Sequence, residues 1–178
     1  MSRTHKGPVR RVVTGHDAKG RAIVQSDRSF DPVDIPSGDA AFALIWTAPT
    51  LPVDNDDPTD GRERDAGLTL RGGSAIRVTD MYPGQQSPMH RTSSLDYGIV
   101  LSGRLELELD DGVIVALTAG DIVVQRGTIH LWRNPSDSET CRIVFVLTEA
   151  APVTIDGRAL ADVHPEDAAA AAGGSAIR

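Results

Sequence analysis

The sequence predicts an all-β fold that closes into a sandwich, barrel or jelly roll. From residue 74 to about residue 148, short stretches rich in β-branched and apolar residues are separated only by turn-forming Gly, Asp and Asn. Helices do not fit between them, and closed sheets remove exposed edges. The seven expected strands are SAIRVTDMY, LDYGIVLSG, RLELELDDG, VIVALTAG, DIVVQRG, HLWRN and CRIVFVLT.

The third of these segments shows the clearest strand pattern. Three leucines alternate with three acidic residues from Leu105 to Asp110, which is typical of an antiparallel strand with one buried face. Asp111 and Gly112 follow directly and predict a hairpin turn into the next segment.

Residues 1–73 are expected to add strands and a long loop to this barrel. Residues 10–26 predict a hairpin around Asp17 and Gly20, and AFALIW at 41–46 predicts a buried strand that ends before Pro49. Residues 48–73 are rich in Pro, Asp and Gly and lack any periodicity. Such a long loop is mobile, covers a pocket or contacts a second subunit, and the sequence leaves these options open.

The C-terminal extension, residues 151–178, is expected to contain a short helix. The text ADVHPEDAAAAAGG at 161–174 is rich in alanine, Pro165 suits a first helical turn, and the two glycines suit a stop. The predicted organisation is therefore an N-terminal part at 1–73, a barrel at 74–150 and this extension.

Composition limits the class of protein. The 178 residues are 40% hydrophobic and 24% charged, as in soluble globular domains. No stretch approaches the ~20 apolar residues of a membrane span, and the first residues lack the apolar core of a signal peptide, so we expect a cytoplasmic protein without membrane contact. A net charge of −7 disfavours nucleic acid as a partner. Cys141 is the only cysteine, which excludes an intrachain disulfide and a cysteine-based zinc cluster.

Two motifs in the strand-rich part resemble the cupin family. The segment GQQSPMHRTSSLDYGIVLSG places Gly84, His90, Thr92, Asp96 and Gly103 at the spacing of the first cupin motif, which is Gly, five residues, His-x-His, three or four residues, Glu, six residues, Gly. The resemblance implies a cupin double-stranded β-helix, a jelly-roll barrel, here with extra N-terminal strands.

The second cupin motif is matched less completely. The segment GDIVVQRGTIHLWRN carries Gly120, Gly127, His130 and Asn134, with one residue fewer between the two glycines than the family has. Either motif alone is weak, because Gly and His at loose spacing recur by chance. The pair is specific, and it predicts a pocket that holds His90 and His130.

The resemblance implies a reduced metal site. Cupins of the fuller pattern bind a divalent metal through three His and one Glu, but Thr92 replaces the second His and Asp96 replaces the Glu. The implied ligands are His90, Asp96 and His130, for Fe, Ni, Mn or Zn; two His and one carboxylate also form the sites of non-haem iron enzymes. Alternatively, both His are satisfied polar residues lining a metal-free barrel, and Asp96 is a turn residue at a strand entry.

The side chains expected around this site are Thr92, Gln86, Tyr97 and Trp132. Each also has a structural interpretation: Thr92 as a strand former, Gln86 as a solvated loop residue, and the two aromatic residues as core. Because residues i and i+2 of a strand share a face, His90 is expected to point with Thr92 and His130 with Trp132. Asp96 is expected to point with Gly98, which would leave open space beside the carboxylate.

Three functions are compatible with these residues. The first is an enzyme that acts on a small carbonyl, aromatic or polyketide-like molecule through the metal, as a dioxygenase, isomerase or lyase. The second is a metal-free dehydratase, decarboxylase or isomerase in which His90 or His130 transfers a proton. The third is a non-catalytic module that binds a small ligand. The motif segments also resemble small cupins encoded among secondary-metabolite enzymes, which implies an enzyme, and family resemblance implies a homodimer.

Overall fold

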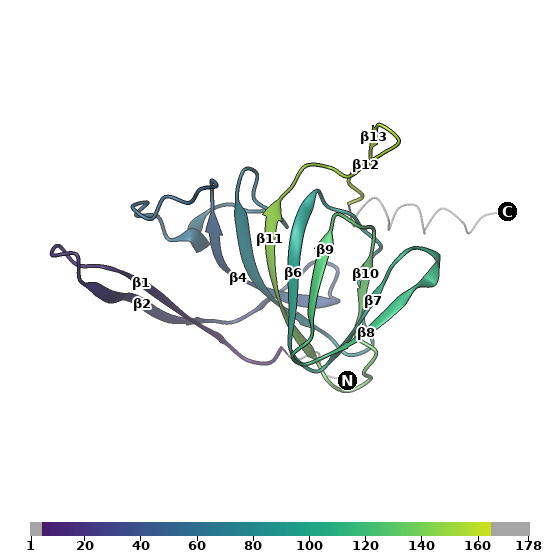
Figure 1. Cartoon of the computed structure of the whole chain (residues 1–178). Helices are drawn as coiled ribbons and strands as arrows, with labels where there is room; N and C mark the ends of the chain where they lie inside the picture. Colours follow the sequence, from purple (N-terminus) through teal and green to yellow (C-terminus); the bar gives the residue numbers. More distant parts are fainter. Residues whose placement is uncertain (1–4, 165–178) are drawn as a thin grey trace.

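The computed structural model describes residues 5–164, which form antiparallel sheets and very little helix (Figure 1). One sheet has six strands in the order β3-β4-β5-β11-β6-β9, and a second has three in the order β10-β7-β8. The all-β prediction is confirmed, and the seven segments predicted after residue 73 are strands. Their bounds are β5 (Ser74–Met81), β6 (Ser94–Ser102), β7 (Arg104–Glu108), β8 (Ile114–Thr118), β9 (Ile122–Arg126), β10 (Leu131–Arg133) and β11 (Cys141–Glu149).

Side chains from both sheets meet in one hydrophobic core. The alternation in β7 explains its role: Leu105 is 1% exposed and faces the core, whereas Glu106 and Glu108 bind Arg133 of the neighbouring β10 on the other face. The predicted turn after β7 is present, and Asp111 and Gly112 both have positive φ there. The core is composed of Met81, Val100, Leu105, Leu107, Leu117, Trp132, Cys141 and Ile143.

The N-terminal part extends this barrel in two ways. The predicted strand at 41–46 lies within β4 (Ala40–Ala48), which pairs antiparallel with β5 and continues the six-stranded sheet out to β3 (Val33–Asp34). The predicted hairpin is formed by β1 (Val9–His16) and β2 (Ala22–Phe30), which pair only with each other. Figure 1 shows this hairpin projecting away from the barrel.

The loop at 48–73 is held against β4 by a charged pair. It contains a single turn of 3-10 helix, η1 (Gly61–Glu63), preceded by Asp60. Both carboxylate oxygens of Asp60 accept hydrogen bonds of 2.6 Å from the guanidinium of Arg11 on β1, and Arg11 also donates to the carbonyl of Ile45 on β4. The pair therefore joins the hairpin, the loop and the sheet.

The described part of the C-terminal extension contains no helix. Two short strands, β12 (Thr154–Ile155) and β13 (Arg158–Ala159), form a small hairpin, and Val163 makes a backbone bridge to Arg91. Most of the helix predicted at 161–174 lies outside the described residues, and 161–164 are not helical. Within residues 5–164, no helix is long and apolar enough to cross a membrane.

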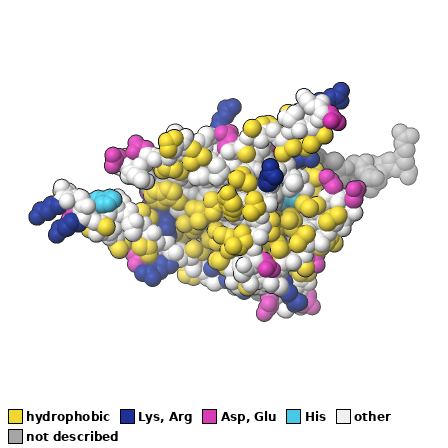
Figure 2. All heavy atoms as spheres, viewed as in Figure 1, with side chains coloured by type: hydrophobic (Ala, Val, Ile, Leu, Met, Phe, Trp, Pro, Cys, Tyr) yellow, Lys and Arg dark blue, Asp and Glu magenta, His cyan; other side chains and the backbone are white. Residues whose placement is uncertain are grey.

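Exposed apolar side chains gather on the outer face of the six-stranded sheet. On β6 and β9, Tyr97, Leu101, Ile122 and Val124 are each at least 40% exposed, and Figure 2 shows hydrophobic atoms across this face. Contiguous apolar surface of this kind often marks a contact site. The homodimer stays our prediction: sedimentation equilibrium at micromolar concentration should give the mass of two chains, and a monomer would contradict it.

The Arg11–Asp60 pair allows a test of how the N-terminal part contributes to stability. The Arg11 side chain is only 4% exposed, so Asp60→Asn should lower the free energy of unfolding by about 3 kcal/mol, because it leaves a buried charge without its partner. The matched control is Asp27→Asn, which breaks the exposed pair with Arg10 on the same hairpin and should cost far less, because solvent screens an exposed pair. Urea unfolding measures both, and equal losses would contradict the assignment.

Candidate functional site

A cavity of about 540 Å³ lies between the two sheets. Its wall is mostly apolar and includes Phe42, Leu105, Trp132, Ile143 and Phe145. Strands β4, β5, β6 and β11 of the larger sheet line it, and the smaller sheet lines it through β7 and β10. Residues of the segment before β4, and Leu68 of the long loop, also reach it. The loop therefore covers part of the pocket, which was one of the options that the sequence left open.

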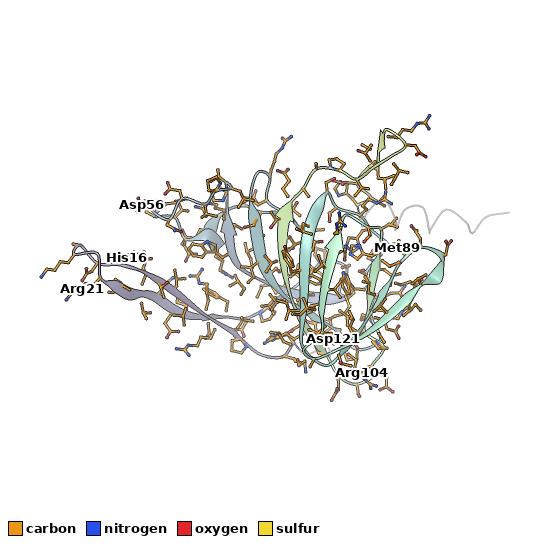
Figure 3. All side chains as sticks on the ribbon, viewed as in Figure 1. His16, Arg21, Asp56, Met89, Arg104 and Asp121 are labelled. Atoms are coloured by element: carbon orange, nitrogen blue, oxygen red, sulfur yellow. The ribbon has the colours of Figure 1, made fainter. Side chains whose placement is uncertain are left out.

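His90 and His130 lie side by side on the wall of this cavity. Their backbones form an antiparallel bridge, in which each N–H donates to the carbonyl of the other residue, at 2.8 and 2.9 Å. The two ring centroids are 4.2 Å apart. In Figure 3, Met89 marks the segment that leads to this bridge, beside β10. The structure thus brings together the two imidazoles that the sequence predicts to converge.

The hydrogen bonds determine which ring nitrogens carry protons. Nδ1 of His90 lies 2.9 Å from the carbonyl oxygen of Pro88, and Nδ1 of His130 lies 3.0 Å from that of Thr128. A carbonyl oxygen only accepts, so both Nδ1 atoms donate a proton and both Nε2 atoms keep a lone pair. Burial lowers the pKa of His90, and burial together with the neighbouring His90 lowers the pKa of His130 to about 3. Both rings are therefore neutral at neutral pH.

Gln125 contacts His130 and was not among the residues predicted for the site. Its amide nitrogen lies 3.0 Å from Nε2 of His130 and 2.6 Å from Nδ1. The amide thus lies against the ring edge that carries both nitrogens, and it limits how the ring can turn and what can approach Nε2. His90 keeps the free Nε2. The alternation of β9 could have identified this residue, because it places the polar Gln125 on the inner face of the strand. Gln125 is 5% exposed, whereas Ile122 and Val124 are 65% and 55% exposed.

Asp96 lies on β6 directly opposite Gln125 of β9 and also lines the cavity. Its side chain is buried, and Oδ1 has no hydrogen-bond partner among residues 5–164. Burial raises the pKa of Asp96 from 3.8 to about 6, although the hydroxyl of Ser94 partly opposes this. The carboxyl group therefore exchanges a proton close to neutral pH.

The three residues implied as metal ligands do not form one ligand set. No group of three His, Cys, Asp or Glu within residues 5–164 is placed to hold a metal ion. The amide of Gln125 also lies 3.0 Å from Nε2 of His130, where a metal ion would have to bind. The side chains as arranged in residues 5–164 therefore do not fit the site that the resemblance implies.

The other expected pocket residues divide into two groups. Thr92 and Trp132 line the cavity with His90 and His130, as the shared strand faces predict. Gln86 and Tyr97 do not line it: Gln86 is exposed and accepts a hydrogen bond from Arg133, and Tyr97 is 40% exposed.

The open space expected at Gly98 is filled. A Cβ on Gly98 would lie 3.1 Å from the ring of Phe145. The glycine therefore allows this ring to pack close against β6, and it does not enlarge the pocket beside Asp96.

The opposite pKa shifts predict opposite pH slopes of stability. Between about pH 4 and 6, folded Asp96 holds a proton that the unfolded chain releases, so it makes the unfolding free energy fall as pH rises. His130 does the reverse from pH 6.5 down to about 3, because only the unfolded chain binds its proton. Relative to the wild type, Asp96→Asn should make the slope more positive and His130→Gln more negative, each by up to about 1.4 kcal/mol per pH unit.

Urea unfolding at pH 4, 5 and 6 measures these slopes. If a substitution only disturbs packing, it lowers the unfolding free energy equally at each pH and leaves the slope against pH unchanged. A change in slope therefore reports the lost titration of the substituted group. The assignment would be wrong if both variants shifted the slope in the same direction.

Comparisons with known proteins agree with this fold. The Cupin_2 family model, described as a cupin domain, matches residues 77–147. Phomopsin biosynthesis cluster protein C' of Diaporthe leptostromiformis is 41% identical over 160 residues, which cover 86% of this chain and 85% of that protein. The cupin-domain-containing oxidoreductases fogC of Aspergillus ruber and srdB of Neurospora crassa are 35% and 34% identical, over 83% and 84% of this chain and 76% and 78% of their own lengths. The resemblance seen in the two motifs is confirmed, and the chain belongs to the cupin family.

Proposed function

We propose that this cupin is an enzyme that moves a proton on a small organic molecule in the barrel cavity, in an isomerisation, dehydration or decarboxylation. The observation that carries the proposal is the pair of neutral imidazoles on the wall of a mostly apolar cavity. A volume of about 540 Å³ is in the range of small-molecule sites. Relatives named for a biosynthesis cluster or as oxidoreductases support an enzyme of small-molecule metabolism.

His90 is the base in this proposal. Its Nδ1–H is held by the carbonyl of Pro88, so the ring is oriented and Nε2 keeps its lone pair. Burial lowers the pKa of His90, so the ring stays unprotonated and able to accept a proton at neutral pH. His130 lies against it and is itself held by Gln125 and Thr128. His130 therefore acts mainly by positioning His90.

Asp96 is the acid in this proposal. Its free Oδ1 and its pKa of about 6 leave part of the population protonated near neutral pH. A base with a lowered pKa and an acid with a raised pKa in the same cavity are the combination that proton transfer in both directions requires. The substrate would give a proton to His90 and receive one from Asp96.

A metal-dependent oxidoreductase is the second candidate, because relatives are named as oxidoreductases. Such a site requires a third ligand beside His90 and His130, and it requires Gln125 to release His130. Elemental analysis of the purified protein, with His130→Ala as the control, separates the candidates. A stoichiometric metal that is lost in the variant would favour the oxidoreductase.

Proton transfer can be tested before the substrate is known. In D₂O, the wild type should catalyse exchange of carbon-bound hydrogen in some members of a panel of small carbonyl and aromatic compounds, followed by proton NMR. His90→Gln should slow this exchange by about 100-fold or more, because the base is removed. His16→Gln changes an exposed histidine near the tip of the hairpin (Figure 3) and should have no effect.

Treatment with a chelator completes this test. Exchange that survives chelation supports the metal-free mechanism. Exchange that is lost on chelation and returns with Fe, Ni, Mn or Zn would contradict it, as would equal rates in the wild type and His90→Gln. Binding without exchange across the panel would identify a ligand-binding module instead.

A further inference from the structure

Arg77 is a buried cation without an acidic partner. It lies on β5, is 7% exposed and lines the cavity. Its guanidinium donates one hydrogen bond, from Nη2 to the carbonyl of Gly67 at 2.6 Å, and lies 5.0 Å from the ring centroid of Phe42. Within residues 5–164, no carboxylate lies within ion-pair distance of it.

Arg11 is as deeply buried as Arg77 but has an acidic partner, and so do two partly buried arginines. The side chains of Arg11, Arg64 and Arg142 are 4%, 16% and 13% exposed, and each of them contacts a carboxylate. Two acids also line the cavity, but neither forms an ion pair with Arg77. Asp39 accepts a hydrogen bond from Ser37, and Asp96 lies on β6. Arg62 and Arg91 are partly buried and bond to backbone carbonyls instead of carboxylates, but neither lines the cavity. Arg77 is therefore the arginine whose unmatched charge faces the cavity.

An unpaired buried charge is costly, so its position requires a reason. Removal from water lowers the pKa of Arg77, and burial is the sole cause of this shift. A guanidinium has five donors in a planar arrangement that matches a carboxylate. The single protein bond to Gly67 uses one of them, and the residue faces a cavity large enough for a ligand.

We infer that Arg77 binds a carboxylate of the substrate, so that the cavity accepts a small organic acid with an apolar body. The inference deepens the proposed function and rests on it for the identity of the cavity as the reaction site. With a net charge of −7, the protein as a whole repels anions. Preferential binding of an acid in the cavity therefore depends on the positive charge of the Arg77 guanidinium.

The sheet register places the rest of such an acid. Arg77 of β5 is directly opposite Phe145 of β11, which is directly opposite Gly98 of β6, and Asp96 lies two residues before Gly98. Strands β5 and β6 flank β11, so their backbones are about 10 Å apart. An acid held at Arg77 would extend across the Phe145 ring toward Asp96. The reacting carbon would then lie several bonds from the carboxylate.

The test compares matched acids and amides of the same shape. Phenylacetate with phenylacetamide, and hexanoate with hexanamide, are titrated by calorimetry and by the fluorescence of Trp132, which lines the cavity. The wild type should bind at least one acid about tenfold or more tightly than its amide, since hydrogen bonds to a charged group are the stronger ones. In Arg77→Gln this ratio should fall to about one.

Two further variants control for charge and folding. Arg104→Gln removes one exposed positive charge at the end of the barrel away from Met89 (Figure 3) and should keep the preference. Arg77→Lys keeps the charge without the planar fork and should keep a reduced preference, so it tests the inference even if Arg77→Gln does not fold. No preference for acids in the wild type, or a preference that is unchanged in Arg77→Gln, would overturn the inference.

These outcomes are distinct from those of the proton-transfer test. A preference for acids that depends on Arg77, without any hydrogen exchange, would retain the carboxylate site and reject the proposed reaction. Exchange that depends on His90, without a preference for acids, would do the opposite.

Discussion

The backbone bridge between His90 and His130 is the constraint on which the site depends. Two hydrogen bonds join residues that are forty positions apart, so the segment before β6 is fixed to the start of β10. Ser87, which donates from its backbone to Trp132, extends this attachment. Side chains directly opposite each other in an antiparallel pair emerge on the same face, which is why both imidazoles reach the cavity. The geometry of the pair is thus a consequence of strand pairing and does not require a bound ion.

Most of the barrel could be predicted from local patterns. Three predicted features depend only on residues that are close in sequence, and all three are observed. They are the alternation in β7, the turn at Asp111 and the apolar run that forms β4. The same rule should have excluded Tyr97 from the pocket. Asp96 and Tyr97 are consecutive residues on β6, so they point to opposite faces, and the side chain that faces inward is the aspartate.

The residues that complete the site could not be predicted, because they depend on which strands become neighbours. Gln125 acts on His130 because β9 pairs with β6 and continues toward the turn before β10. Arg77 was an ordinary strand residue in the sequence, and its missing counter-ion becomes visible only when all neighbouring acids have positions. The metal ligands were inferred from motif spacing, which fixes the order of residues along the chain but not the distances between their side chains.

Two charged groups on the wall of the cavity are less well paired than Asp80, a buried charge of the scaffold. Asp80 belongs to the scaffold, is completely buried, and accepts two hydrogen bonds from Arg142 and one from the backbone of Lys6. Around the cavity, Asp96 has a free oxygen and Arg77 lacks an acid. Such groups lower stability, and this chain shows that it can pair buried charges elsewhere. A molecule in the cavity that offers a carboxylate to Arg77 and a hydrogen-bond donor to Asp96 would offset this cost.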